Sequence, residues 1–318
     1  MKKVIASIIC IMVVFGTVIL PSSASANEVF GKVGLVTTNS TRLMVRKSSS
    51  AKSDVVYALN KGSYVTLIEH NNGWWKVEYL EGQFGYCKDD YISEVSVTYA
   101  KVNLNSGSLN IREGAGTNYK SIGYLKNGNT VTVLSSSNGW SKIIFNGTKI
   151  GYVSEKYLTE IFQAIKLNVP NFKQNDNRWA NVKIGNSGKT IAQIGCVTTA
   201  LAMTESVRLN TTIYPDAMTK RLNYTQSGNV YWPSNYKTVL SNSNYLEKIY
   251  ELLKSGKPIV FGSKNRSGGQ HWVVITGFKG GSTLSAANFT INDPGSNKIT
   301  TLQQHLNSHP IFYKFLYY

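Results

Sequence analysis

The sequence has 318 residues, enough for two or three domains, with 34 Lys and Arg against 17 Asp and Glu. The formal net charge of +17 favours anionic partners and argues against an acidic or neutral binding surface. The basic residues are spread along the chain, and no helix-turn-helix, zinc-finger or RNA-binding signature is present. Nucleic acid is therefore only the second choice of partner.

The first 26 residues have the pattern of a signal peptide. Lys2 and Lys3 precede an apolar run, Val4–Leu20, and a small-residue cleavage site, Ala24–Ala26. A retained membrane anchor is the alternative, because the run is close to the length that spans a bilayer. Cys10 lies inside the run rather than at its end after a small residue, so lipid attachment is not expected.

Removal of residues 1–26 predicts an exported protein with net charge +15. Its expected partners are anionic cell-wall polymers rather than nucleic acid, and no membrane contact is expected after signal removal. Cys87 and Cys196 remain, and we expect both to be free thiols because they fall in separate predicted domains.

Two copies of one module follow, aligned without a gap at an offset of 66 residues. Leu43–Arg46 recurs as Leu109–Arg112, and Asn72–Trp74 recurs as Asn138–Trp140. Each copy contains about five short β-branched and aromatic runs separated by turn signals such as Asn-Gly. This pattern predicts a small closed or half-open β-barrel in each copy.

The two copies resemble bacterial SH3 (SH3b) domains, over residues 29–95 and 99–161. The resemblance implies targeting to the bacterial cell wall, often through its peptide part. Aromatic residues in both copies could line a peptide-binding face, or could serve only the core and strand pairing: Trp74, Tyr86, Trp140 and Tyr152. Residues 96–100 and 162–167 are expected to be short linkers.

Residues 167–318 combine helical and strand patterns in an order typical of an α+β domain. Helical patterns cover 192–209, 216–222 and 246–254, and strand-like runs follow at 258–261, 271–277 and 289–294. Cys196 follows Gly195 and opens a helix expected to end near Leu209. The unpaired N–H groups and the dipole at such a helix start favour a thiolate, which is the nucleophilic form of cysteine. A buried, inert thiol is the alternative.

A nucleophilic cysteine needs a base and a group that orients the base. Of the four histidines, His271 opens an apolar strand after a Gly-rich loop, and Asp293 ends the next strand. We expect Asp293 to accept a hydrogen bond from Nδ1–H of His271. The other three histidines, at positions 70, 305 and 309, are expected to have no catalytic role. The N–H of Cys196 and the side chain of Gln174 are candidate oxyanion donors.

Four blocks, at 169–179, 195–203, 269–277 and 291–295, together resemble the C39-like cysteine peptidases of papain-like fold. The resemblance implies Cys196 as nucleophile, His271 as base, Asp293 as orienting group and Gln174 as oxyanion donor. Where that family usually has Gly-Pro after the cysteine, this chain has Val197 and Thr198, so we expect a different turn and a narrower cleft. No paired His or Cys ligands suggest a metal or another cofactor.

Trp232 is expected either to form part of the substrate-binding cleft or to pack in the core. The sequence thus predicts a secreted, cell-wall-associated cysteine peptidase that cleaves peptide bonds of peptidoglycan or of wall-associated peptides. One alternative is a wall-anchored protease that acts on proteins or peptides. The other is a non-catalytic wall-binding protein.

Overall fold

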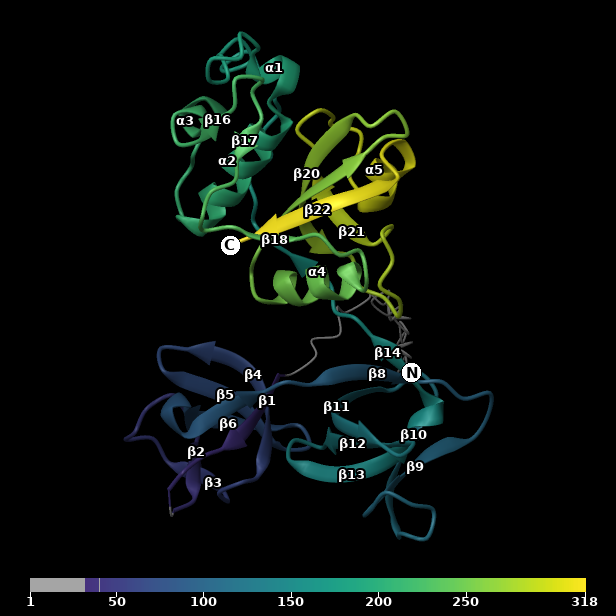
Figure 1. The fold of residues 1–318 in the computed structure, drawn as a ribbon. Helices are drawn as coiled ribbons and strands as arrows, with labels where there is room; N and C mark the ends of the chain where they lie inside the picture. The colour runs from purple at the N-terminus through teal and green to yellow at the C-terminus, as the bar shows by residue number, and fades with distance from the viewer. Residues whose placement is uncertain (1–31, 40) are drawn as a thin grey trace, which may run out of the picture.

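The computed structural model describes residues 32–39 and 41–318; the expected signal peptide lies outside the described residues. Two all-β units come first, and an α+β unit follows them (Figure 1). This arrangement confirms the predicted fold class. Within the described part of the chain, no helix combines the length and hydrophobicity needed to cross a bilayer.

Each β unit is a seven-stranded antiparallel sheet, with two more strands than the sequence pattern suggested. The order β3-β2-β6-β5-β4-β1-β7 in the first sheet recurs as β10-β9-β13-β12-β11-β8-β14 in the second. The first sheet contains β1 (Lys32–Val36), β2 (Leu43–Arg46), β3 (Val55–Leu59), β4 (Tyr64–Asn71), β5 (Trp74–Leu80), β6 (Gln83–Lys88), the 3-10 turn η1 (Asp89–Tyr91) and β7 (Ile92–Val95).

The second sheet repeats this pattern 66 residues later. It contains β8 (Thr98–Val102), β9 (Ser108–Arg112), β10 (Ser121–Lys126), β11 (Thr130–Ser137), β12 (Trp140–Phe145), β13 (Lys149–Ser154), η2 (Glu155–Tyr157) and β14 (Leu158–Ile161). Alternate strand residues fill each small core, among them Val45, Val65 and Val77 in the first sheet. Cys87 lies fully buried in that core, and Cys87 and Cys196 are both free, as expected.

The β12–β13 turn of the second barrel docks against the first barrel. The main-chain N–H and the hydroxyl of Thr66 both donate to the carbonyl of Gly147, at 3.0 and 2.9 Å. The Thr148 hydroxyl donates to the carbonyl of Tyr79, and the Asn146 amide donates to the carboxylate of Glu81. These hydrogen bonds, together with the short connecting segment, hold one barrel against the other.

The C-terminal unit is built on one sheet, in the order β15-β20-β19-β22-β18, with β21 also paired to β20. Its strands are β15 (Ile165–Lys166), β18 (Lys237–Val239), β19 (Ile259–Lys264), β20 (Gln270–Phe278), β21 (Phe289–Asn292) and β22 (Ile311–Tyr317). Because β15 belongs to this sheet, the interpretation of 162–167 as a linker was wrong. The C-terminal strand β22 lies inside the sheet, between β19 and β18.

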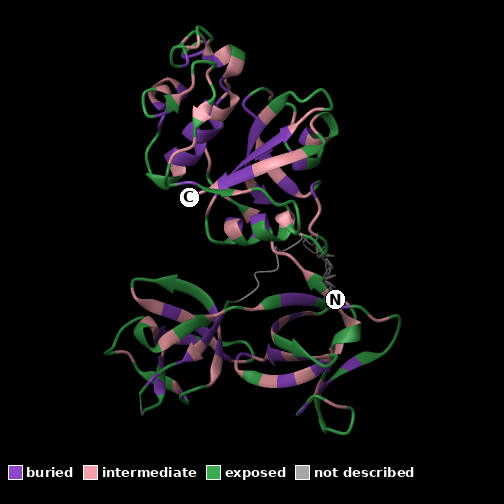
Figure 2. Cartoon of the chain, viewed as in Figure 1, coloured by how far each residue is buried: buried purple, intermediate pink, exposed green. Residues whose placement is uncertain are grey.

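Helices cover the sheet on both sides, since β19 and β20 alternate their side chains between two cores. One core packs α2 against Val260 and Val274; the other packs α4 and α5 against Phe261 and Val273. Figure 2 shows buried stretches along the strands of this sheet and on α2. The remaining elements are α1 (Ile191–Ile194), α2 (Cys196–Arg208), α3 (Pro215–Thr219), β16 (Asn223–Tyr224), β17 (Val230–Tyr231), α4 (Tyr245–Lys254) and α5 (Leu302–Ser308).

Gly147 gives a direct test of the contact between the barrels. A Cβ on Gly147 would come within 2.8–2.9 Å of main-chain atoms of residues 78–80, whereas a Cβ on Gly139 would meet nothing within 4 Å. Both glycines have φ near +80°, so Ala costs about 1 kcal/mol of backbone strain at either position. We expect Gly147→Ala to lower the free energy of unfolding by roughly 1–3 kcal/mol more than Gly139→Ala, measured by urea denaturation. Equal losses would contradict the docked arrangement.

Candidate active site

Cys196 is the first residue of α2, as the sequence predicted. Gly195 precedes it because α1 approaches closely there: a Cβ on Gly195 would lie 2.5 Å from the carbonyl oxygen of Ile191. No side chain caps the start of α2, so the N–H groups of its first turn stay available. The helix dipole and these N–H groups favour negative charge on a sulfur or oxygen placed at this point.

Cys196 and His271 line one cleft of about 810 Å³. One wall comes from α1, α2 and the segment around Val230; the other comes from β20 and β22. Val197 also lines the cleft and adopts ordinary helical geometry, so the position does not need glycine's conformational freedom.

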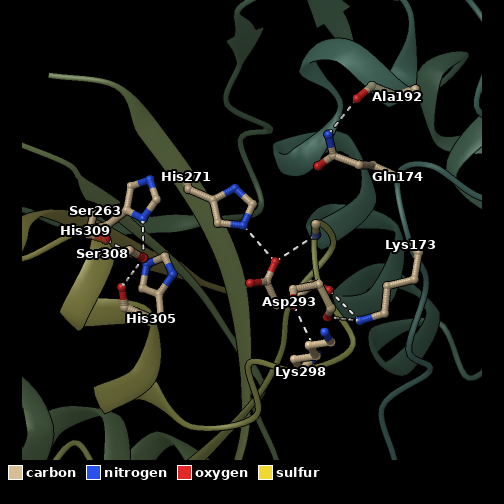
Figure 3. A network of polar contacts seen from close by, with 12 residues as sticks. Lys173, Gln174, Ala192, Ser263, His271, Asp293, Lys298, His305, Ser308 and His309 are labelled. Atoms are coloured by element: carbon tan, nitrogen blue, oxygen red, sulfur yellow. Dashed lines mark hydrogen bonds and ion pairs between the residues drawn. The ribbon is translucent and has the colours of Figure 1, made fainter. Parts of the chain in front are cut away.

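His271 and Asp293 meet because β20 and β21 are antiparallel. The start of β20 therefore lies beside the end of β21. Asn292, which directly precedes Asp293, pairs with Val274 of β20. Nε2 of His271 lies 2.7 Å from Oδ1 of Asp293 (Figure 3). The sequence analysis expected Nδ1 at this contact, and that prediction was wrong. With Nε2 held by the carboxylate, Nδ1 is the nitrogen left for Cys196.

The charges in the site favour an imidazolium. Burial alone would lower the pKa of His271, but hydrogen bonds to Asp293 and Cys196 and the negative charges of these groups raise it to about 10. Asp293 is 2 % exposed, and burial would raise its pKa. The hydrogen bonds from His271 and from the N–H of Gly295, at 2.7 Å, outweigh burial and lower the pKa of this carboxyl.

Gln174 also lines the cleft, and its side-chain N–H₂ group is partly engaged. Nε2 donates to the carbonyl of Ala192 at 2.9 Å, which leaves its second N–H free. Oε1 is buried without a hydrogen-bond partner. The main-chain N–H of Gln174 donates to the carbonyl of Pro294, so Gln174 is attached to the turn that carries Asp293.

Lys173, which the sequence analysis did not single out, holds the same turn. Its ammonium group donates to the main-chain carbonyls of Asp293 and of Ser296, the latter at 2.7 Å (Figure 3). Burial lowers the pKa of Lys173, and the negative charge of Asp293 opposes that shift. Lys173 and Gln174 together attach the Asp293 turn to the segment at the edge of the cleft.

Two further histidines lie beside His271, although the sequence suggested no role for them. His271 shares its face of β20 with Val273, and α5 covers that face. His305 of α5 is fully buried, with its ring 5.7 Å from that of His271, and His309 stacks on His305. Nε2 of His305 contacts the Ser263 hydroxyl at 2.6 Å. Burial lowers the pKa of His305 to about 4, so this ring is neutral. The period-two alternation of side chains along β20 could have indicated that His271 faces the same side of the sheet as Val273, where α5 packs.

Among the described residues, the group close enough to hold a metal ion is His271, Asp293 and His305, whose ligand atoms lie within 4.8 Å of one another. Two of these atoms already bind each other directly, as Nε2 and Oδ1. The His271 and Asp293 atoms of this group are therefore already engaged with each other.

Trp232 lines the cleft and packs on Trp272, with ring centroids 4.9 Å apart. It is also one of the partly buried residues that pack against the core on the α2 side of the sheet. Trp232 therefore lies where the core opens into the cleft, and its role in substrate binding stays a prediction.

Comparison with known families assigns each unit. Residues 41–93 and 107–159 each match the bacterial SH3 domain family, and residues 166–314 match the Peptidase_C39 like family. The chain carries two bacterial SH3 domains and one Peptidase_C39-like domain. The family resemblances seen in the sequence are thereby confirmed, and so is the assignment to the C39-like hydrolases at the level of family.

The curated relatives that the chain matches include proteins named as an endopeptidase and as an amidase. "Probable endopeptidase p60" of Listeria innocua is 35% identical over 32% of this chain and 21% of its own length. "Putative N-acetylmuramoyl-L-alanine amidase YrvJ" of Bacillus subtilis is 25% identical over 50% of this chain and 31% of its own length. The chain thus spans less than a third of either relative.

Among solved structures, NlpC2 from Trichomonas vaginalis aligns over 90% of this chain and 96% of its own, at 17% identity and a TM-score of 0.21. A score of this size does not support a shared overall fold.

The two thiols should differ in reactivity. Burial raises the pKa of Cys87 to about 12 and removes it from solvent, whereas Cys196 lies in the cleft beside an imidazolium. We expect iodoacetamide at pH 7 to alkylate Cys196 at least about tenfold faster than Cys87, and His271→Ala to slow the reaction of Cys196. Peptide mass mapping over time measures both rates. Equal rates for the two thiols would contradict an activated Cys196.

Lys173→Met removes both bonds to the Asp293 turn and should loosen the alignment of His271. We expect the alkylation rate of Cys196 to fall by roughly tenfold, because two charge-assisted hydrogen bonds are lost. Lys298→Met is the matched control, since it removes a charge from the same segment without a hydrogen bond from its ammonium group among the described contacts. Identical rates in the two variants would show that Lys173 does not position the turn.

Proposed function

We propose that the protein is a secreted cysteine peptidase that cleaves peptide bonds in peptidoglycan or wall-associated peptides. The observation that carries this proposal is the geometry of the cleft, in which Cys196 begins a helix beside His271, and His271 bonds to the buried Asp293. The family match of residues 166–314 supports it, and so do the names of two relatives, a probable endopeptidase and a putative N-acetylmuramoyl-L-alanine amidase.

In the proposed reaction, the Cys196 thiolate attacks the carbonyl carbon of the scissile bond and a C–S bond forms. The N–H of Cys196 and the free N–H of Gln174 stabilise the developing oxyanion. Nδ1–H of the His271 imidazolium gives its proton to the leaving nitrogen as the C–N bond breaks. Asp293 holds Nε2 throughout, which keeps the ring aligned and stabilises its charged form.

The second half of the reaction regenerates the enzyme. Nδ1 of His271, now neutral, takes a proton from a water molecule that attacks the thioester carbonyl. The C–S bond then breaks, and the product acid leaves. The sulfur departs as a thiolate beside the restored imidazolium, the charge state that the raised pKa of His271 favours.

We further propose that the barrels bind the cell wall through a groove that both of them carry. The grooves have volumes of about 560 and 470 Å³, and eleven positions line both of them at the 66-residue offset. Trp74 and Arg46 line the first groove, and Trp140 and Arg112 occupy the same places in the second. Paired aromatic and guanidinium groups suit a polar polymer.

Digestion of purified cell walls tests the proposed activity. We expect the wild-type protein to release free amino groups and defined peptide fragments, identified by mass. Cys196→Ala should reduce the rate by roughly 10³-fold or more, because Cys87, the other cysteine in the described part of the chain, is buried away from the cleft. Cys87→Ala, which removes the buried thiol of the first barrel, should keep the activity. Equal release by the wild type and Cys196→Ala would refute the proposal.

A further inference from the structure

The cleft contains no carboxylate to repel an anionic ligand. Residues 166–318 include 17 Lys and Arg but only six Asp and Glu, and none of the six lines the cleft. Three of the six form ion pairs elsewhere in the domain, Asp176 with Arg178, Glu205 with Arg208 and Glu251 with Lys254. The charge that faces the cleft is therefore positive.

Two ammonium groups lie over aromatic rings that line the cleft, although Lys264 and Lys314 do not line it themselves. Lys264 of β19 and Lys314 of β22 each place Nζ over the ring of Tyr313, at 4.5 and 4.6 Å from its centroid. Nζ of Lys314 also lies 5.3 Å from the centroid of Trp232. Tyr313 and Trp232 both line the cleft, so contacts with the two rings hold the lysine side chains at its edge.

These two cations lack a counterion within the described part of the chain. Neither Lys264 nor Lys314 has a carboxylate oxygen within 4.0 Å, and both side chains are only partly exposed. Each ammonium group disfavours the charge of the other, and a bound anion would relieve this repulsion. Lys189, on the opposite wall, is exposed and also has no carboxylate partner among the described residues.

We propose that Lys264 and Lys314 form a specificity site for a free carboxylate of the peptide substrate, beside the Tyr313 and Trp232 rings of the cleft. This inference rests on the proposed peptidase function and names the substrate class: peptides that carry acidic side chains or a free carboxyl terminus. Tyr313 and Trp232 supply the apolar surface for the neighbouring part of the peptide, and the ammonium groups bind its carboxylate.

Soluble wall peptides provide the test, since they avoid attachment to insoluble walls. Peptides released from purified walls by a muramidase are used in native form and after their carboxylates are converted to amides with carbodiimide and ammonium chloride. We expect the wild type to cleave the amidated peptides at least about tenfold more slowly, mainly through a higher KM. The double variant Lys264→Gln/Lys314→Gln should cleave the native peptides only as fast as the wild type cleaves the amidated ones.

The controls separate the possible failures. Lys248→Gln removes an exposed charge from α4, outside the cleft, and should behave as the wild type. An unchanged alkylation rate of Cys196 shows that the double variant retains the folded site. Equal cleavage of native and amidated peptides by the wild type would overturn the carboxylate site but leave the peptidase intact. Equal loss on both substrates in the double variant would also overturn it. Cleavage of neither substrate, with an unreactive Cys196, would overturn the proposed function itself.

Discussion

The antiparallel pairing of β20 with β21 is the constraint on which the candidate site depends. It brings His271, at the start of one strand, beside Asp293, just past the end of the next, although they are 22 positions apart. Within this pairing, the orientation of the His271 ring brings Nε2 to the carboxylate and leaves Nδ1 for the sulfur. Lys173 and Gln174 attach the Asp293 turn from outside the sheet, so the pair is held from two directions.

The barrels and the third domain present different kinds of surface. The barrels are fixed against each other by the turn around Gly147 and carry equivalent grooves, whereas the third domain has a cleft lined by a thiol, an imidazole and aromatic rings. The grooves are not identical in charge: Lys88 and Asp90 in the first correspond to Ser154 and Lys156 in the second. Equivalent backbones with different charges can contact different parts of one polymer.

Much of the fold could be predicted from the sequence, because repeats and periodicity are local signals. The helix from Cys196 and the strands around His271 appeared close to their expected bounds. The errors came from contacts between distant segments. Nothing near residue 165 indicated that it would pair with Phe278, and the position of His305 against His271 depends on how α5 packs over β20. The carboxylate contact to Nε2 likewise follows from side-chain orientation, which sequence spacing does not determine.

The position of β22 affects the order in which the C-terminal domain can fold. This strand is the last element of the chain, yet it fills an interior place in the sheet, between β19 and β18. The sheet therefore stays open until residues 311–317 are available, so the two barrels can fold during synthesis before the cleft is complete. The topology of this sheet thus sets an order of folding, in which the domain that carries the cleft is completed after the two barrels.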